Sequence, residues 1–288
     1  MEEAARDLTP SPDGGCWDAH VHVFRADAPV QAGHYRPGHF PLERIEAEAA
    51  ACGVRHLVLV QPSVYGTDNR CLLDALDRLD GAGRGVAVPP EDAMPVELRR
   101  MHARGVRGVR GVRLNLESSG SQDVAVLAAM LARWSGRIAD LGWHVQLYAA
   151  SDVIAALADR LAALPTRVVL DHFALIAHAL GAKGPGAAIK DMLRTGRVLV
   201  KLSAPYRLPT PALAAAWARA FVETSPTSVL WGSGWPHTTR QPEAGRLGVS
   251  AYRRIAHGDF ADAVQAWLPS PDLRRLVLFD TPADLYGF

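Results

Sequence analysis

Two histidines separated by one residue are the clearest sign of chemistry in this chain. His20 and His22 follow Asp18 in the run Asp-Ala-His-Val-His, and the period of two in a strand places all three side chains on one face. Imidazole nitrogens are ligands that zinc accepts, and inward-pointing histidines at a strand end are rarely mere packing. We therefore expect a functional site at this point of the chain.

Further polar residues follow other short apolar runs, and they indicate what the site binds. Basic side chains outnumber carboxylates among them, and forked guanidinium groups commonly hold a carboxylate in two-point contact. The sequence therefore predicts a wet pocket for a small anionic substrate with several acidic groups. Its expected members are Gln61, Ser63, Arg107 or Arg110, Arg113, Asn115, Gln146, Tyr148, Asp171, His172, Lys201, Ser203, Tyr206, Arg207, Ser233, Gly234 and His237.

These residues need a scaffold of alternating strands and helices. β-Branched runs alternate with longer Ala/Leu/Arg segments, which is typical of repeated βα units. An open doubly wound sheet is disfavoured, because no Gly-rich phosphate turn follows the first run. Eight such units indicate an α/β fold, a single (β/α)8 TIM barrel with its catalytic groups at the C-terminal strand ends. The expected strands are 16–24, 55–62, 84–89, 109–116, 144–149, 167–173, 197–203 and 228–235, and the expected helices are 42–51, 69–79, 95–104, 124–141, 152–164, 186–194, 211–224 and a last group at 252–278.

Length and composition limit the classes of protein that fit. The chain has 288 residues, 49% of them hydrophobic and 21% charged, which excludes disorder as its main state. We expect a flexible lead-in at 1–15 and one barrel at 16–288. A net charge of +1 provides no field that would recruit nucleic acid or a membrane. A cytoplasmic location is favoured by three features of the sequence. The three cysteines lack metal-finger spacing, the first residues lack an apolar signal core, and no long apolar span follows.

A threefold Arg-Gly-Val repeat at 104–113 invites comparison with RNA-binding arginine-glycine tracts. Such tracts are long and lack valine, whereas this repeat leads directly into Leu114. We interpret it as the end of a helix that turns into the fourth strand. Arg107 and Arg113 are six residues apart and share strand parity, whereas Arg110 does not, so Arg107 is the preferred second member of the pocket.

Six motifs at the expected strand ends carry a family resemblance. They are Trp-Asp-Ala-His-Val-His-Val-Phe at 17–24, Val-Gln-Pro-Ser-Val-Tyr-Gly-Thr-Asp-Asn at 60–69, Gly-Val-Arg-Leu-Asn at 111–115, Leu-Asp-His-Phe at 170–173, Val-Lys-Leu-Ser-Ala-Pro-Tyr-Arg at 200–207 and Trp-Gly-Ser-Gly-Trp-Pro-His at 231–237. With these motifs the chain resembles the amidohydrolase superfamily, most closely the amidohydrolase-2 branch that contains the 2-pyrone-4,6-dicarboxylate lactonases. The likeness runs from Cys16 to Phe288 and implies a hydrolase that opens a carboxylated lactone in aromatic-acid catabolism. Sugar-acid lactonases and metal-dependent decarboxylases share several of these motifs.

The resemblance also implies a role for each member of the site. Water attacks the ring carbonyl, the three histidines His20, His22 and His172 face the developing oxyanion, and an aspartate of strand eight takes the proton. The two acid groups of the substrate are held by Ser63, Arg107 or Arg110, Arg113, Tyr148, Arg207 and His237. The remaining histidines, at positions 34, 39, 56, 102, 144, 178 and 257, are assigned to the surface or to loops.

We expect the site to work without a cofactor. The alternative is one divalent ion, zinc or manganese, on His20, His22 and His172, as a metal-dependent decarboxylase would require. Strand eight lacks the carboxylate that metal-dependent members place there, and several positive side chains surround the histidines. A cation without a compensating anion among its ligands would be poorly held.

One departure from the family pattern affects the expected activity. Members of the family have the sequence Trp-Gly-Thr/Ser-Asp-Trp-Pro-His at strand eight, whereas this chain has Gly234 at the position of the aspartate. A smaller departure is Thr239, at a position where family members tend to carry asparagine. Loss of a general base typically costs about 10²- to 10⁴-fold in rate. Three explanations remain open: a substitution in a competent lactonase, another base such as Asp171 or His237, or a non-catalytic barrel that only binds a dicarboxylate. If the pocket is intact, Gly234→Asp raises hydrolysis by about tenfold or more.

Overall fold

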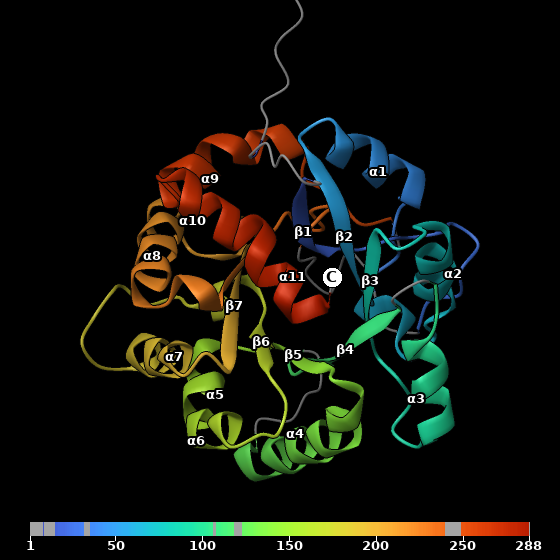
Figure 1. Cartoon of the computed structure of the whole chain (residues 1–288), viewed down its shortest axis with the longest axis horizontal. Coiled ribbons are helices and arrows are strands. Elements are labelled where there is room, and N and C mark those ends of the chain that lie inside the picture. Colours follow the sequence, from blue (N-terminus) through green and yellow to red (C-terminus); the bar gives the residue numbers. More distant parts are fainter. Residues whose placement is uncertain are drawn as a thin grey trace, which may run out of the picture.

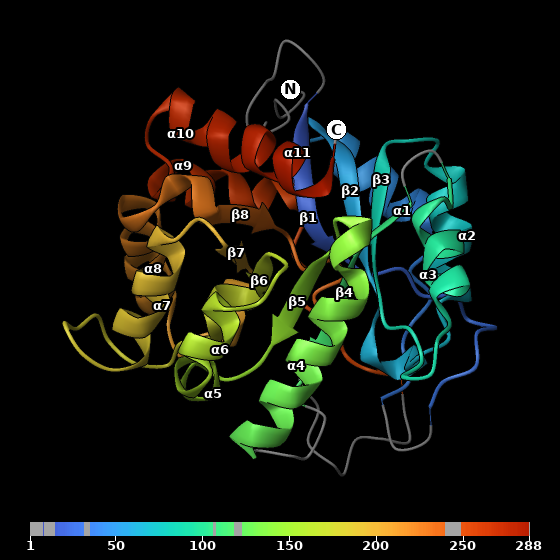
Figure 2. The ribbon, with the colours of Figure 1, turned by 60° about the horizontal axis from the view of Figure 1, so that its bottom comes forward.

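Eight parallel strands form one sheet in sequential order, as the sequence predicts for a TIM barrel. The structure is a computed structural model, and it describes residues 8, 15–31, 35–105, 108–117, 123–239 and 249–287. Figures 1 and 2 show the strands at the centre of the molecule, inside a ring of helices. The strands are β1 (Cys16–Val21), β2 (Val54–Val60), β3 (Gly83–Ala87), β4 (Val109–Asn115), β5 (His144–Tyr148), β6 (Val168–Leu170), β7 (Val198–Ser203) and β8 (Val229–Gly232).

The barrel is closed by the segment that follows β8. Val21 forms a parallel bridge with Trp235, and the His22 amide donates to the Trp235 carbonyl at 2.9 Å. One step earlier, the Gly234 amide donates to the His20 carbonyl at 2.9 Å. The closure therefore places residue 234 directly beside the exit of β1.

The helices cover the outside of the sheet. Asp123 caps α4 by accepting from the Ala125 amide, and Thr210 caps α8 through the Leu213 amide. The helix expected over 152–164 is divided at Leu157, where the backbone leaves helical geometry. The helices are α1 (Leu42–Ala50), α2 (Arg70–Arg78), α3 (Pro95–His102), α4 (Val124–Ile138), α5 (Ser151–Ala156), α6 (Ala158–Ala162), α7 (Pro185–Arg194), α8 (Pro211–Thr224), α9 (Ala261–Trp267), α10 (Pro271–Arg275) and α11 (Thr281–Tyr286).

The inside of the barrel is filled with side chains, and one end is plugged by the C-terminal helix. Tyr286 stacks on Trp17 with ring centroids 5.8 Å apart, and the buried Arg84 donates to the Tyr286 carbonyl at 3.1 Å. Figure 1 shows α11 lying over the centre of the barrel. Since β1 begins at this end, the C-terminal strand ends and any site there lie at the opposite end. The enclosed apolar residues are Trp17, Ala19, Val58, Val60, Val86, Val169, Leu199, Leu230, Leu285 and Tyr286.

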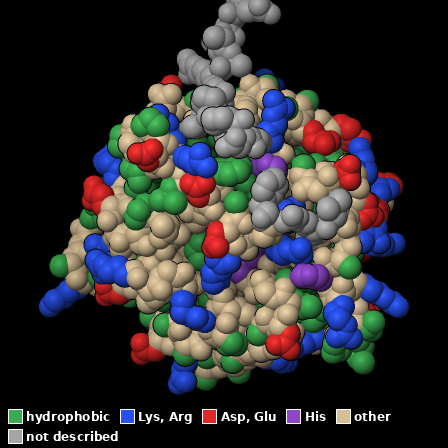
Figure 3. Space-filling model, in the orientation of Figure 1, with side chains coloured by type: hydrophobic (Ala, Val, Ile, Leu, Met, Phe, Trp, Pro, Cys, Tyr) green, Lys and Arg blue, Asp and Glu red, His purple; other side chains and the backbone are tan. Residues whose placement is uncertain are grey.

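The surface carries charges of both signs. On the face that α11 covers, Figure 3 shows acidic and basic side chains interspersed, with no continuous basic area. No helix in the described part of the chain is long and apolar enough to span a bilayer.

Two regions singled out in the sequence are only partly described. Leu8 is 1% exposed, and its amide donates to the Cys52 carbonyl at 3.2 Å, but residues 1–7 and 9–14 lie outside the described residues. The flexible lead-in therefore stays a prediction. Within the Arg-Gly-Val repeat, residues 106 and 107 also lie outside, and β4 begins at Val109, as expected for a repeat that leads into the fourth strand.

Candidate functional site

The exit of β1 is irregular, and this irregularity decides which of its side chains enter the site. Trp17 and Ala19 belong to the apolar interior, and the pairing with β2 shifts register between Asp18 and Val21. The expectation that Asp18 shares a face with both histidines is therefore wrong. Its carboxylate instead accepts from the Ser233 amide and lies 2.9 Å from Nε2 of His257.

The two β1 histidines face each other. Nε2 of His20 lies 3.3 Å from Nε2 of His22, and Nδ1 of His22 donates to the Val60 carbonyl at 2.7 Å. Because that bond fixes the hydrogen of a neutral His22 on Nδ1, its Nε2 carries a lone pair directed at His20. Burial lowers the pKa of His22 well below its usual range, and it lowers the pKa of His20 to about 4.

Asp171, at the end of β6, is the charge at the centre of this cluster. Its oxygens lie 3.3 Å from Nδ1 of His20, 3.5 Å from Nε of Arg113 and 3.8 Å from Nζ of Lys201. Burial alone would raise the pKa of Asp171, but the interactions with His20, Lys201 and Arg113 outweigh it and hold the pKa well below its usual value. Lys201 also donates to Gln146 at 2.7 Å, and burial lowers its pKa to about 8.

His172 reaches the cluster from a left-handed turn. Residues 172–175 all have positive φ, between 46° and 55°, although none is glycine. Such backbone costs about 1–3 kcal/mol per residue and is concentrated at functional sites. The turn places the His172 ring 4.6 Å from that of His20, with Nδ1 2.8 Å from the Ser203 hydroxyl oxygen. Burial lowers the pKa of His172 well below its usual range.

Two guanidinium groups lie near one aromatic ring beside these histidines. The Cζ atoms of Arg113 and Arg207 lie 5.4 Å and 5.9 Å from the Tyr148 ring centroid, and this ring meets His172 edge-on at 5.4 Å. The buried Nε of Arg207 has no hydrogen-bond partner among the described residues. Arg113 and Ser63 also line a cavity of about 300 Å³. Elements β2, β4, β5, β6 and β7 thus bring the expected residues together.

Arg110 of the Arg-Gly-Val repeat does not join this group. Arg110 donates to the carbonyls of His102 and Val109, at the beginning of β4. It therefore lies at the end of the strand opposite to Arg113. Arg107 lies outside the described residues, so its place in the pocket stays a prediction.

Strand eight contributes a glycine in a left-handed turn, followed by a histidine. Gly234 has a φ of +75°, and a Cβ at this position would lie 3.2 Å from both the Ala204 Cβ and the Tyr206 hydroxyl oxygen. The same hydroxyl lies 3.4 Å from Nδ1 of His237, which is 1% exposed. Tyr206 thus occupies the space next to the missing side chain.

The histidine cluster has part of the donor set of a metal site. His20, Asp171 and His172 offer atoms within 4.8 Å of one another. Two imidazole nitrogens 3.3 Å apart also suit Zn–N bonds of about 2.0–2.1 Å in a tetrahedron. The carboxylate, however, is already paired with Arg113 and Lys201, so a divalent cation would lie beside two positive side chains.

Several histidines assigned to the surface or to loops are in fact buried. His257 is 1% exposed and pairs with Asp18; His144 is 1% exposed and meets the Tyr286 ring edge-on at 5.4 Å. His56 stacks on Trp17 at 4.7 Å. The parity of β5 signals His144, because it shares a face with Gln146, but no sequence signal identifies His257, which lies far beyond β8.

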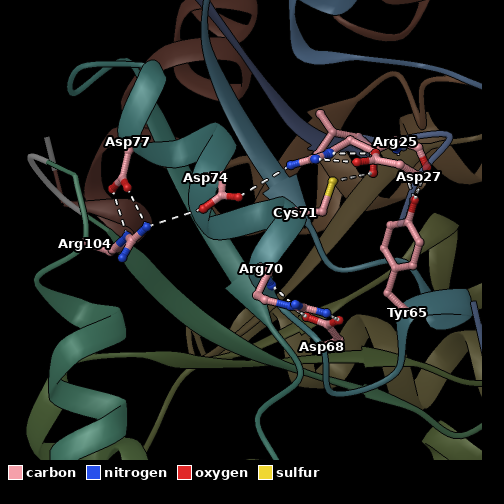
Figure 4. Close-up of polar contacts among 10 residues, drawn as sticks. Arg25, Asp27, Tyr65, Asp68, Arg70, Cys71, Asp74, Asp77 and Arg104 are labelled. Atoms are coloured by element: carbon pink, nitrogen blue, oxygen red, sulfur yellow. Dashed lines mark hydrogen bonds and ion pairs between the residues drawn. The ribbon is translucent and has the colours of Figure 1, made fainter. Parts of the chain in front are cut away.

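A second polar cluster, drawn in Figure 4, lies outside the barrel and joins the β1–α1 loop to α2 and the end of α3. Each arginine in it is paired with at least one aspartate. Burial raises the pKa of the neighbouring Cys71 to about 11, so this thiol is not a nucleophile at neutral pH. We interpret the cluster as a solvated ion-pair network; its charged members are Arg25, Asp27, Asp68, Arg70, Asp74, Asp77 and Arg104.

A parallel barrel with paired histidines at the exit of β1 and further polar groups on most other strand ends is the architecture of an amidohydrolase. The family model described as Amidohydrolase matches residues 17–288. The chain therefore belongs to this family, as its motifs predict.

Its relatives include hydrolases of lactones. The chain is 31% identical over 95% of its length to 4-sulfomuconolactone hydrolase of Rhizobium radiobacter, covering 90% of that protein. It is 30% identical over 94% of its length to 2-pyrone-4,6-dicarboxylate hydrolase of Comamonas testosteroni, again covering 90%. Among solved structures, a putative 2-pyrone-4,6-dicarboxylic acid hydrolase of Pseudomonas putida is 33% identical with a TM-score of 0.77, over 95% of this chain and 97% of that one. A probable enzyme of the same kind from Acinetobacter baumannii, with citric acid bound, has 25% identity and a TM-score of 0.77, over 95% of this chain and all of that one.

Proposed function

We propose that this protein hydrolyses a small lactone that carries two acidic groups, such as 2-pyrone-4,6-dicarboxylate or 4-sulfomuconolactone. The observation that carries the proposal is that the Cζ atoms of Arg113 and Arg207 lie 5.4 Å and 5.9 Å from the centroid of the Tyr148 ring, which itself contacts His172. Two guanidinium groups gathered at one aromatic ring suit the two acid groups of a small lactone. The names of the relatives and the citric acid in one of them support an anionic substrate.

In the proposed reaction water adds to the ring carbonyl, and an imidazole N–H of His172 stabilises the negative oxygen that forms. If the Ser203 hydroxyl donates to Nδ1 of His172, the hydrogen of that imidazole lies on Nε2 and is available to the oxyanion. The cluster of Asp171, Arg113 and Lys201 fixes His20 through its Nδ1. Collapse of the intermediate then breaks the ring C–O bond and opens the lactone.

We propose that no metal takes part, because two cationic side chains already neutralise Asp171 and because position 234 offers no second carboxylate. No step above is routed through an ion. A role in aromatic-acid catabolism and a cytoplasmic location stay predictions of the sequence.

The experiment is an assay of the full chain, purified without chelator, on 2-pyrone-4,6-dicarboxylate and on 4-sulfomuconolactone, followed by the loss of ultraviolet absorbance. We expect hydrolysis of at least one lactone, unchanged by EDTA. His172→Ala lowers kcat by about 10²- to 10³-fold, as loss of one oxyanion donor does. The exposed Val126→Ala is the control and keeps full activity.

Two results contradict the proposal. Tight calorimetric binding of both lactones without turnover would make the protein a dicarboxylate-binding barrel. Near-stoichiometric zinc or manganese by elemental analysis, with activity lost in EDTA, would remove the metal-free mechanism and favour the decarboxylase alternative.

A further inference from the structure

The proposed hydrolysis requires a base for the attacking water. The two carboxylates near the end of β1 are already held in ion pairs and hydrogen bonds. Asp171 is held by His20, Arg113 and Lys201. Asp18 accepts from the Ser233 amide and pairs with His257. A carboxylate paired in this way is a weak proton acceptor. The third candidate position, 234, is glycine.

We infer that Tyr206 and His237 act together as the proton acceptor for the attacking water, in the space beside Gly234. The Tyr206 hydroxyl oxygen lies 3.2 Å from where a Cβ of residue 234 would be, and 3.4 Å from Nδ1 of His237. Gly234 is itself hydrogen-bonded to the His20 carbonyl, so this hydroxyl lies on the strand-eight side of the histidine cluster. The inference rests on the proposed lactone hydrolysis and adds two catalytic residues to it.

Burial makes His237 a base of about carboxylate strength. Burial has the largest effect and lowers the pKa of His237 to about 4; the charges of His257 and Arg253 also lower it, whereas Asp18 and the Ile255 carbonyl raise it. An ordinary aspartate has a pKa of about 3.9, so the imidazole matches the side chain that position 234 lacks. It is neutral and ready to accept a proton at neutral pH.

Tyr206 transfers the proton and does not keep it. Burial raises the pKa of Tyr206 to about 12, opposed by Arg207 and by Arg253, whose Cζ lies 4.4 Å from the centroid of its ring. A phenol of this pKa does not ionise alone, so it accepts a hydrogen from water only as it gives its own to a base. Nδ1 of His237 is the nitrogen within its reach.

The step balances in protons and bonds. As the water oxygen bonds to the ring carbonyl carbon, one water proton moves to the Tyr206 oxygen, and the phenolic proton moves to Nδ1 of His237. The imidazolium returns a proton through Tyr206 to the ring oxygen when its C–O bond breaks. Lactone and water give the open hydroxy acid, and both side chains regain their starting states.

The test compares Tyr206→Phe, His237→Gln and the double variant on the lactone that the wild type hydrolyses. We expect each single variant to lower kcat by about 10²- to 10⁴-fold with little change in KM. The double variant is no slower than the slower single one, because the two residues act as a unit. Tyr65→Phe is the matched control: it removes a tyrosine hydroxyl that contacts Arg25 on the outer side of the barrel, and it keeps the wild-type kcat.

A rescue separates chemistry from structure. Adding Gly234→Asp to Tyr206→Phe introduces a carboxylate on the side chain next to position 206. Aspartate is among the residues that best tolerate a positive φ, and removal of the hydroxyl relieves one 3.2 Å contact with the new Cβ. We expect kcat to recover by about tenfold or more.

Folding of each variant is checked by circular dichroism, and binding by calorimetry with the lactone. A folded Tyr206→Phe that keeps more than about half of the wild-type kcat overturns the inference and leaves the proposed hydrolysis intact. A wild type inactive on every lactone tested overturns the proposed function, and the relay with it. Failure of Gly234→Asp to raise the kcat of a folded Tyr206→Phe also contradicts the relay.

Discussion

Among individual residues, Arg113 and Arg207 both face Tyr148 but are not equivalent. Arg113 bonds to Asp171 and, through Nη1, to the Gln61 carbonyl at 3.3 Å, so it supports the site as well as any ligand. The Nε of Arg207 has no partner among the described residues. A buried guanidinium nitrogen without a hydrogen-bond partner contributes most to binding free energy when an anion supplies that partner.

This difference predicts how the two arginines respond to substitution. Arg207→Ala raises KM by about 10- to 150-fold, corresponding to about 1.5–3 kcal/mol for a lost charged hydrogen bond, with a smaller effect on kcat. Arg113→Ala lowers kcat as well, because Asp171 loses a positive partner. Steady-state kinetics on the proposed lactone measures both, with Arg207→Lys as the charge-preserving control. Unchanged affinity in both alanine variants would refute the dianion site.

Among the elements, β1 is held to the turn after β8 and to the later segment His257–Phe260 by the Asp18 carboxylate, which accepts from the Ser233 amide and pairs with His257. Burial alone would raise the pKa of Asp18, but the hydrogen bond and charge of His257 and the contacts with Ser233 outweigh it and lower the pKa. The pair spans 239 positions of sequence and fixes the turn that carries Gly234.

Removing one partner leaves the other buried without compensation. We expect Asp18→Asn to reduce the free energy of unfolding at pH 7 by about 3–5 kcal/mol, measured by urea denaturation. The control is Asp27→Asn, which removes an exposed ion pair with Arg25 and changes the free energy of unfolding little. A loss in Asp18→Asn no larger than in this control would show that the pair does not stabilise the fold.

The same pair predicts a dependence on pH. Because the folded pKa of Asp18 is lowered, its contribution to stability is present above the unfolded pKa of about 3.9 and is lost as the pH falls through the folded value. Asp18→Asn lacks this contribution, so its stability falls less between pH 5 and the acid limit than that of the wild type. Parallel acid titrations of the two proteins, followed by circular dichroism, test this prediction. An equal fall in the stability of both proteins would exclude this role of Asp18.

At the scale of the whole molecule, the two ends of the barrel have different tasks. At the end plugged by α11, Tyr286 stacks on Trp17, and Arg84 donates to the carbonyls of Tyr286 and Gly287. The histidine cluster, Arg113 and Arg207 lie at the other end. Substitutions at the plug therefore affect stability and leave the site unchanged.

We expect Tyr286→Ala to lower the free energy of unfolding by about 3–5 kcal/mol, as loss of a large buried aromatic ring does. The KM of the folded fraction stays at the wild-type value. Urea denaturation and kinetics at low temperature test this, and the exposed Val126→Ala should change stability by less than about 0.5 kcal/mol. A large rise in KM would mean that the plug and the site are coupled.

Much of the barrel was predictable from sequence because its signals are local. Runs of branched residues and their spacing locate all eight strands to within a few residues, and the motif at 17–24 identifies the β1 histidines. Parity also sets Arg110 apart from Arg113, because alternate side chains of a strand face opposite sides. These features depend on neighbours a few residues apart.

The sequence by itself thus determined the fold, the family and most of the residue types at the strand ends. Only the tertiary structure decided that Asp18 turns away from the histidines, that His257 is buried against it, and that the Tyr206 hydroxyl lies beside Gly234. The reason is physical: each depends on a register shift or on barrel closure, which bring together residues distant along the chain. No local periodicity records such a contact.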